Sequence, residues 1–159
     1  MKQGQRLQRE FNKLLDMLCL NNEIFTWYQF PRIVHYKNVP SDNLIISKDG
    51  QKVYFVELKE SNNKHGNFQR GSFDNEHQLV MNSTLRNNNI YHIYVFGNYT
   101  NSEEGFYYMI PDIKKLNIKH KSFISTDELL SASTFSTTSL YHLLQELIKY
   151  PIGDKYENH

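Results

Sequence analysis

The sequence has little cysteine, since Cys19 is the one cysteine among its 159 residues. A single thiol excludes an internal disulfide, a four-cysteine zinc site and a Cys-x-x-Cys redox pair. Long hydrophobic runs are missing too: none approaches the ~18 residues of a membrane-spanning helix, and Met1 to Arg6 contain no apolar stretch like that of a signal peptide. We therefore expect a soluble, cytoplasmic protein that does not act in a membrane.

The sequence also has no excess of charge of either sign. Eighteen Lys and Arg against seventeen Asp and Glu give a formal net charge of +1, so any binding of nucleic acid must use local patches. The histidines show no zinc-ligand spacing, no glycine loop suits a phosphate or nucleotide cofactor, and no Ser-His-Asp set can be assigned. The abundance of asparagine, as at 87–89, favours an AT-rich bacterial or phage genome.

A hydrophobic fraction of 39% over residues 1–159 predicts a single folded domain whose last few residues are disordered. The residue patterns predict helices over 4–20, 74–86 and 137–150, a polar loop over 60–72, and strands over 24–36, 43–47, 51–59, 90–97 and 105–110. Pro31 requires a bend or an edge position in the first strand. This order predicts an α/β fold with a mixed central β-sheet flanked by helices.

Asp49 and Gly50 form the strongest hairpin signal in the chain. If they are the two loop residues, the numbers of paired positions sum to 99, so Asp42 faces Glu57. Residues opposite each other hold their Cβ atoms ~4.5–5.5 Å apart, and two like charges there destabilise a sheet. A divalent cation between the two carboxylates would remove that cost.

Alternation along the strand places Lys59 on the face of Glu57, with the backbone carbonyl of Leu58 nearby. Such oxygen ligands suit Mg²⁺, for which Mn²⁺ can substitute, and Lys59 can orient the attacking water or offset charge on phosphate. The alternative is a turn-capping Asp42 and an ordinary Glu57–Lys59 pair on a solvated strand. Against it, paired carboxylates are costly beside an apolar surface, and the residues that share their face are apolar: Leu44, Ile46, Val53 and Phe55.

Ser41-Asp42, followed by fourteen residues and then Glu57-Leu58-Lys59, resembles the PD-(D/E)xK motif of restriction enzymes, repair nucleases and Holliday-junction resolvases. The following features are similar to RecU-type resolvases: the run 55–61, Phe68, His77-Gln78 and Met81. The resemblance spans roughly 39–108 and implies a restriction-endonuclease-like core.

In this family, Asp42, Glu57 and the Leu58 carbonyl would hold Mg²⁺, and Lys59 would assist the attacking water. Gln78 would support the metal and its waters from a helix, where it shares an inward stripe with Met81 and Leu85. The alternative for Gln78 is a place on a solvent face. Glu10 corresponds to an acidic residue on the family's first helix, or is simply an exposed side chain among Arg6, Arg9 and Lys13.

Residues that flank the proposed site are candidates for contacts with DNA phosphates: Arg32, Lys37, Ser41, Ser61, Lys64 and Arg70. The alternative for the basic residues among them is an ordinary solvated surface. We therefore expect a Mg²⁺-dependent endonuclease that resolves branched DNA. RecU proteins insert a long stalk where this chain has only 28–41, so two alternatives stay open. One is a nuclease of the same class with a restriction or flap substrate, and the other is a non-catalytic DNA-binding module of the same fold.

A junction resolvase must make two matched cuts, which predicts a two-fold homodimer that uses the outer strands of the sheet or the first helix. The later strands are rich in aromatic residues: Tyr91, Tyr94, Phe96, Phe106, Tyr107 and Tyr108. These residues serve either a dimer interface or the two covered faces of the sheet.

Overall fold

The protein was analysed as a computed structural model, which describes residues 5–31, 41–61, 68–69, 89–99, 105–109, 123–124, 131 and 133–151. The helices and strands, in chain order, are α1 (Gln5–Leu20), β1 (Ile24–Gln29), β2 (Asn43–Ser47), β3 (Val53–Ser61), β4 (Phe68–Gln69), β5 (Ile90–Asn98), β6 (Gly105–Met109), β7 (Phe123–Ile124), β8 (Phe135–Thr137) and α5 (Leu140–Leu147). The predicted helix over 74–86 lies outside the described residues.

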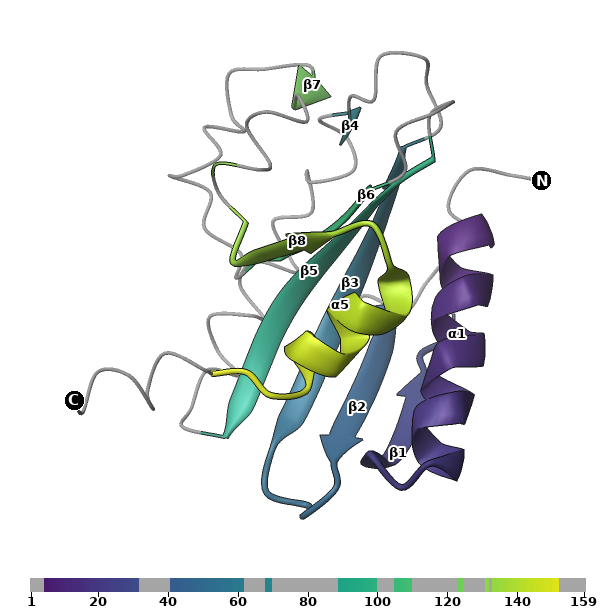
Figure 1. Ribbon diagram of the computed structural model, residues 1–159, viewed down its shortest axis with the longest axis vertical. Helices are drawn as coiled ribbons and strands as arrows, with labels where there is room; N and C mark the ends of the chain where they lie inside the picture. Colours follow the sequence, from purple (N-terminus) through teal and green to yellow (C-terminus); the bar gives the residue numbers. More distant parts are fainter. Residues whose placement is uncertain are drawn as a thin grey trace.

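A six-stranded sheet forms the centre of the fold, with strand order β1-β2-β3-β5-β6-β8 (Figure 1). Strands β3 and β5 are parallel, and the other neighbours are antiparallel. Both α1 and α5 pack on the same face of this sheet, while β4 and β7 form a separate two-stranded pair. The predicted α/β fold with a mixed sheet is thus confirmed. No helix among the described residues is long and apolar enough to cross a membrane.

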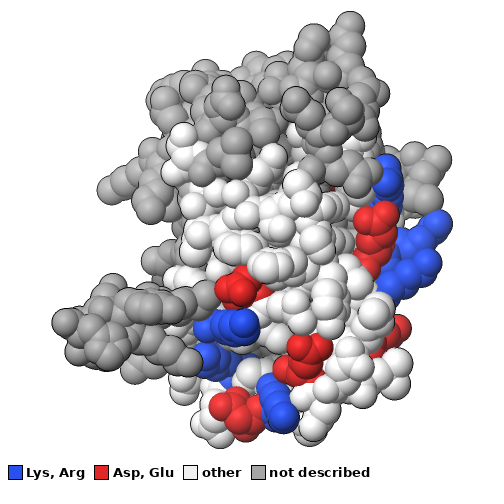
Figure 2. All heavy atoms as spheres, viewed as in Figure 1, with Lys and Arg blue, Asp and Glu red and all other residues white. Residues whose placement is uncertain are grey.

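The helices reach the sheet through leucine and phenylalanine side chains at helical spacing. In α1 the fully buried residues are Leu7, Phe11, Leu15 and Leu18, and in α5 they are Leu143, Leu144 and Leu147. They join one core with Ile45, Val56, Ile93 and Val95 of the central strands. On this face of the molecule, acidic and basic side chains are interspersed along α1, at the end of α5 and near the β2–β3 turn (Figure 2).

Truncation of Leu15 to alanine is expected to lower the free energy of unfolding by about 2–5 kcal/mol, because it leaves a cavity beneath α1. Urea unfolding followed by circular dichroism measures this loss. Lys13→Ala, at an exposed position of the same helix, is the matched control and should change stability by about 0.5 kcal/mol or less. Equal losses in the two variants would contradict the packing of α1.

The hairpin register is the one that the Asp49-Gly50 turn predicts. Asn43 pairs with Val56, and Ile46 with Val53, so the numbers of paired residues sum to 99. Gly50 adopts a φ of 74°, in the left-handed region that glycine enters without a steric penalty.

Several predicted boundaries differ from those in the structure. The loop predicted to begin at Glu60 is strand instead, because Glu60 and Ser61 still pair with Gly97 and Asn98 of β5. The helix predicted over 137–150 begins at Leu140, because the side chain of Ser139 caps it by accepting from the His142 N–H, and Thr137 belongs to β8. The first strand ends at Gln29, before Pro31, and lies at a sheet edge as predicted.

Five of the six aromatic residues in the later strands are buried in the sheet, and Tyr91 is half-buried. Their exposed fractions are 3% at Tyr94, 0% at Phe96, 3% at Phe106, 6% at Tyr107 and 1% at Tyr108. Adjacent positions are buried alike, so both faces of β5 and β6 are covered. These aromatic residues therefore give no support to a dimer interface.

Candidate functional site

Asp42 lies directly before β2, at the end of this strand away from the Asp49 turn. Its N–H donates to the Val56 carbonyl at 3.1 Å, and its carboxylate Oδ2 accepts from the Leu58 N–H at 2.7 Å. Strand β2 begins at Asn43, so no strand residue is left to pair with the Leu58 N–H. The Asp42 side chain accepts from that N–H instead. This bond fixes the Asp42 carboxylate beside the Glu57–Leu58 peptide.

Glu57 and Lys59 lie on the sheet face away from α1, and both are buried, with exposed fractions of 8% and 9%. Lys59 Nζ lies 3.4 Å from Glu57 Oε1 and 5.8 Å from the centre of the Tyr94 ring. Burial raises the pKa of Tyr94 above its ordinary value, and the negative charge of Glu57 raises it further. The alternative was an ordinary Glu57–Lys59 pair on a solvated strand. It is wrong in one respect, because both side chains are buried.

An aromatic surface leads up to this pair, as the apolar pattern of the strand predicted. Phe55 stacks on Phe30 with ring centres 6.2 Å apart and on His92 with ring centres 5.1 Å apart. A buried carboxylate and ammonium at the end of such a surface are expensive to desolvate. Stability alone therefore does not explain why these two charged side chains are buried here.

The start of β2 is held to α1 by a network of side-chain amides. Asn43 is fully buried, and its Oδ1 accepts from Gln8 Nε2 at 2.7 Å while its Nδ2 donates to Asn12 Oδ1 at 3.0 Å. The Ser41 hydroxyl donates to the Asn43 carbonyl at 2.8 Å. These bonds fix the backbone on both sides of Asp42.

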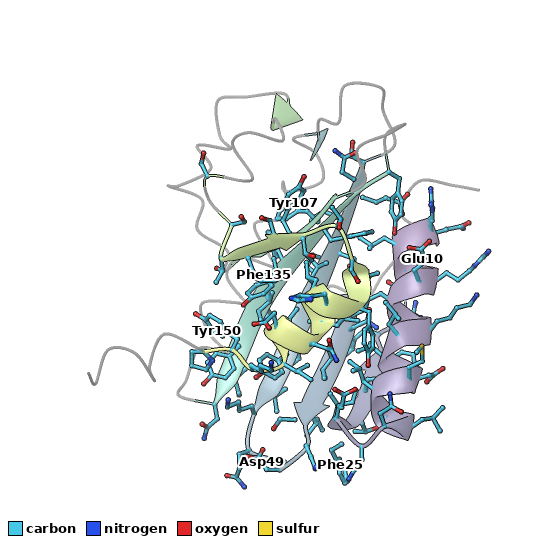
Figure 3. All side chains as sticks on the ribbon, in the orientation of Figure 1. Glu10, Phe25, Asp49, Tyr107, Phe135 and Tyr150 are labelled. Carbon is cyan, nitrogen blue, oxygen red and sulfur yellow. The ribbon has the colours of Figure 1, made fainter. Side chains whose placement is uncertain are left out.

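Glu60 and Glu10 lie on the opposite face, with α1. Glu60 Oε1 accepts from the Leu7 N–H at 2.6 Å, which satisfies one of the free donors in the first turn of α1. Glu10 Oε2 accepts from the Tyr99 hydroxyl at 2.7 Å, and Glu10 Oε1 lies 3.3 Å from Arg6 Nε. Figure 3 shows Glu10 in the upper half of α1 as drawn. The structure therefore joins Glu10 to Tyr99 and Arg6.

Removal of the Glu60 carboxylate is expected to destabilise the fold. Glu60→Ala leaves the Leu7 N–H buried without this acceptor and should cost about 1–3 kcal/mol. Glu60→Gln keeps an acceptor but loses the charge at the positive end of the helix, which should cost about 0.3–1 kcal/mol. Thermal unfolding of the two variants tests this order, and a Glu60→Ala protein as stable as the wild type would contradict it.

Two of the residues predicted to contact DNA lie among the described residues. Ser41 and Ser61 are both buried, with exposed fractions of 1% and 0%, so their hydroxyl groups do not face solvent. The other predicted DNA contacts lie outside the described residues: Arg32, Lys37, Lys64 and Arg70. Gln78, predicted to support the metal and its waters, lies outside them too.

Neither Asn43 nor Tyr94 was predicted for the site from the sequence. The hairpin register, which pairs Asn43 with Val56, could have located Asn43, whereas Tyr94 reaches Glu57 only through the parallel pairing of β3 with β5.

Three groups with oxygen atoms lie at this end of the β2–β3 pair: the Asp42 and Glu57 carboxylates and the Leu58 carbonyl. The Leu58 carbonyl points to the same edge of β3 as the Leu58 N–H, which Asp42 binds. Asp42, Glu57 and this carbonyl are hard oxygen donors, and Mg²⁺ commonly takes one or two carboxylates and fills its other positions with water. Within the part of the chain that the structure describes, no three His, Cys, Asp or Glu residues gather as a metal group, so a zinc-like cage is not present there.

The sequence matches none of the protein-family models, and no curated protein matches it either.

Proposed function

We propose that the protein is a Mg²⁺-dependent DNA endonuclease of the PD-(D/E)xK class with a restriction-endonuclease-like core. One observation carries this proposal: the Asp42 carboxylate is bound to the Leu58 N–H at 2.7 Å, on the strand that also carries the buried Glu57–Lys59 pair. Fourteen residues lie between Asp42 and Glu57 in the sequence. The hairpin register brings these two residues to the same end of the β2–β3 pair.

Asp42, Glu57 and the Leu58 carbonyl would hold Mg²⁺ or Mn²⁺. When bound, the cation would polarise the scissile phosphate and lower the pKa of water. Asp42 contributes a carboxylate that is oriented before substrate arrives, because one of its oxygens accepts from the Leu58 N–H of β3. Lys59 contributes a positive charge that Glu57 and the Tyr94 ring hold in place, suited to stabilise charge that develops on phosphate.

The favoured substrate is branched DNA, as the similarity to RecU-type resolvases implies. A restriction or flap substrate at the same site is the second candidate. A non-catalytic DNA-binding module is disfavoured, because Asp42, Glu57 and Lys59 are all present and the two strand residues are buried together.

The proposal is tested with a panel of labelled four-way junctions, flaps, linear duplexes and single strands. We expect cleavage with Mg²⁺ or Mn²⁺, none with a chelator, and the highest rate on the four-way junction. A higher rate on flaps or duplexes would retain the nuclease and reject the resolvase. Failure to cleave any of these DNAs with either cation would overturn the proposal.

A further inference from the structure

A row of four aromatic rings crosses the sheet face that lies away from α1. Tyr28 meets the Phe30 ring edge-on, with ring centres 5.5 Å apart. Phe30 and Phe55 stack with centres 6.2 Å apart and an angle of 18° between their planes. Phe55 and His92 stack at 5.1 Å with an angle of 11°. These four residues are called the aromatic row below.

The strand pairing explains why the row lies on this face. Asn43 points toward α1, where it binds Gln8, so its neighbour Leu44 points to the other face. Leu44 pairs with Tyr28 of β1 on one side and with Phe55 of β3 on the other. Directly paired residues have side chains on the same face of a sheet, so Tyr28 and Phe55 share the face of Leu44.

The aromatic row is exposed at its β1 end and buried at its β5 end. Tyr28 has an exposed fraction of 55%, and His92 one of 4%. Phe30 and Phe55, between them, are half-buried. Solvent therefore reaches the outer rings of the row, and none of these three outer side chains carries a charge.

The aromatic row leads directly into the proposed site. The Phe30 N–H donates to the Asp42 carbonyl at 2.9 Å. Phe55 precedes Glu57 by two positions on the same face of β3, which corresponds to a rise of ~6.6 Å. A DNA phosphate that the cation and Lys59 bind would therefore have its own nucleoside beside these rings.

We propose that the aromatic row stacks with an unpaired base of DNA next to the scissile phosphate. This inference rests on the proposed function for the identity of the ligand. Every base has a flat π-face, so bases of any sequence stack on aromatic side chains. In a duplex the bases are paired and stacked on one another, so only an unpaired or flipped base can reach the row. The site would accordingly take DNA that has unpaired nucleotides at the point of cleavage.

The experiment measures the binding of a labelled oligothymidine by fluorescence anisotropy in the presence of Mg²⁺. The parent protein is the full-length Asp42→Asn variant, which is expected to bind DNA without cutting it. Addition of Tyr28→Ala should weaken the affinity about 5–150-fold, the usual effect of removing one stacking ring. Tyr28→Phe keeps the ring and should bind as the parent does. Tyr28→Leu keeps an apolar side chain without a ring and should bind as weakly as Tyr28→Ala.

Two controls isolate the contact with the base. An abasic deoxyribose-phosphate chain of the same length has the phosphates without the bases, so the parent and Tyr28→Ala should bind it equally. Phe25→Ala removes another exposed ring of β1, with an exposed fraction of 69%, at the end of the sheet near Asp49 (Figure 3). It should leave the affinity for oligothymidine unchanged. Circular dichroism checks that each variant is folded.

The outcomes separate this inference from the proposed function. Equal affinities of the parent and Tyr28→Ala for oligothymidine, or no binding by the parent, would overturn the stacking role and leave the nuclease to its own test. An equal loss on the abasic chain would also overturn it, because Tyr28 would then act on the phosphate contacts. A loss confined to oligothymidine supports stacking, even in a protein whose wild type cuts no DNA.

Discussion

Asp42→Asn and Glu57→Gln are each expected to abolish Mg²⁺-dependent cleavage of DNA while the protein stays folded. A carboxylate ligand contributes several kcal/mol of charge stabilisation through its cation, and each 1.36 kcal/mol is tenfold in rate, so we expect a loss of about 10³-fold or more. The amide in Asp42→Asn retains an oxygen that can accept from the Leu58 N–H. The substitution therefore removes the charge and keeps the hydrogen bond.

The rates of the two variants are compared under single-turnover conditions with matched DNA binding and unfolding curves. Asp49→Asn is the control, because Asp49 is an exposed carboxylate at the other end of the same hairpin (Figure 3), and it should cleave at the wild-type rate. DNA binding should be retained or tighter in the site variants, since a negative charge near phosphate is lost. Cleavage at the wild-type rate by either one would refute the metal assignment.

The part of this site that the sequence predicts is the part determined by local structure. Asp49-Gly50 is a short-range signal, and once the turn is placed, the register carries Asp42 to the strand of Glu57 and Lys59. The alternation of side chains then places Glu57 and Lys59 on one face. These steps need no knowledge of the rest of the chain.

The residues whose surroundings the sequence did not predict have partners that are distant along the chain. Glu60 and Ser61 are polar and were predicted to begin a loop, but Glu60 binds the Leu7 N–H, 53 positions away, and Ser61 pairs with Asn98. The carboxylate of Glu10 binds Tyr99, 89 positions away, as well as the nearby Arg6. Tertiary contacts of this kind hold polar residues in strands, and a local sequence pattern does not reveal such contacts.

Lys59→Ala is expected to lower the cleavage rate far more than the affinity for Mg²⁺, because Lys59 is placed to act on the attacking water or on phosphate charge and is not a metal ligand. We expect about 10²–10³-fold in rate, the usual effect of removing one such donor. Lys59 is also half of a buried pair with Glu57, and removal of one partner leaves the other charge uncompensated.

A second substitution separates these two effects. Lys59→Met fills the same space without charge, so its unfolding curve reports the ion pair and its cleavage rate reports the ammonium. Mg²⁺ affinity is measured by calorimetry on the wild type and on both variants, and cleavage at saturating Mg²⁺ gives the rate. A large loss of rate in both variants with nearly constant Mg²⁺ affinity supports a direct role of Lys59 in the reaction. Equal losses of rate and affinity would instead assign Lys59 to the structural support of Glu57, because a carboxylate that has lost its counter-ion no longer keeps its position.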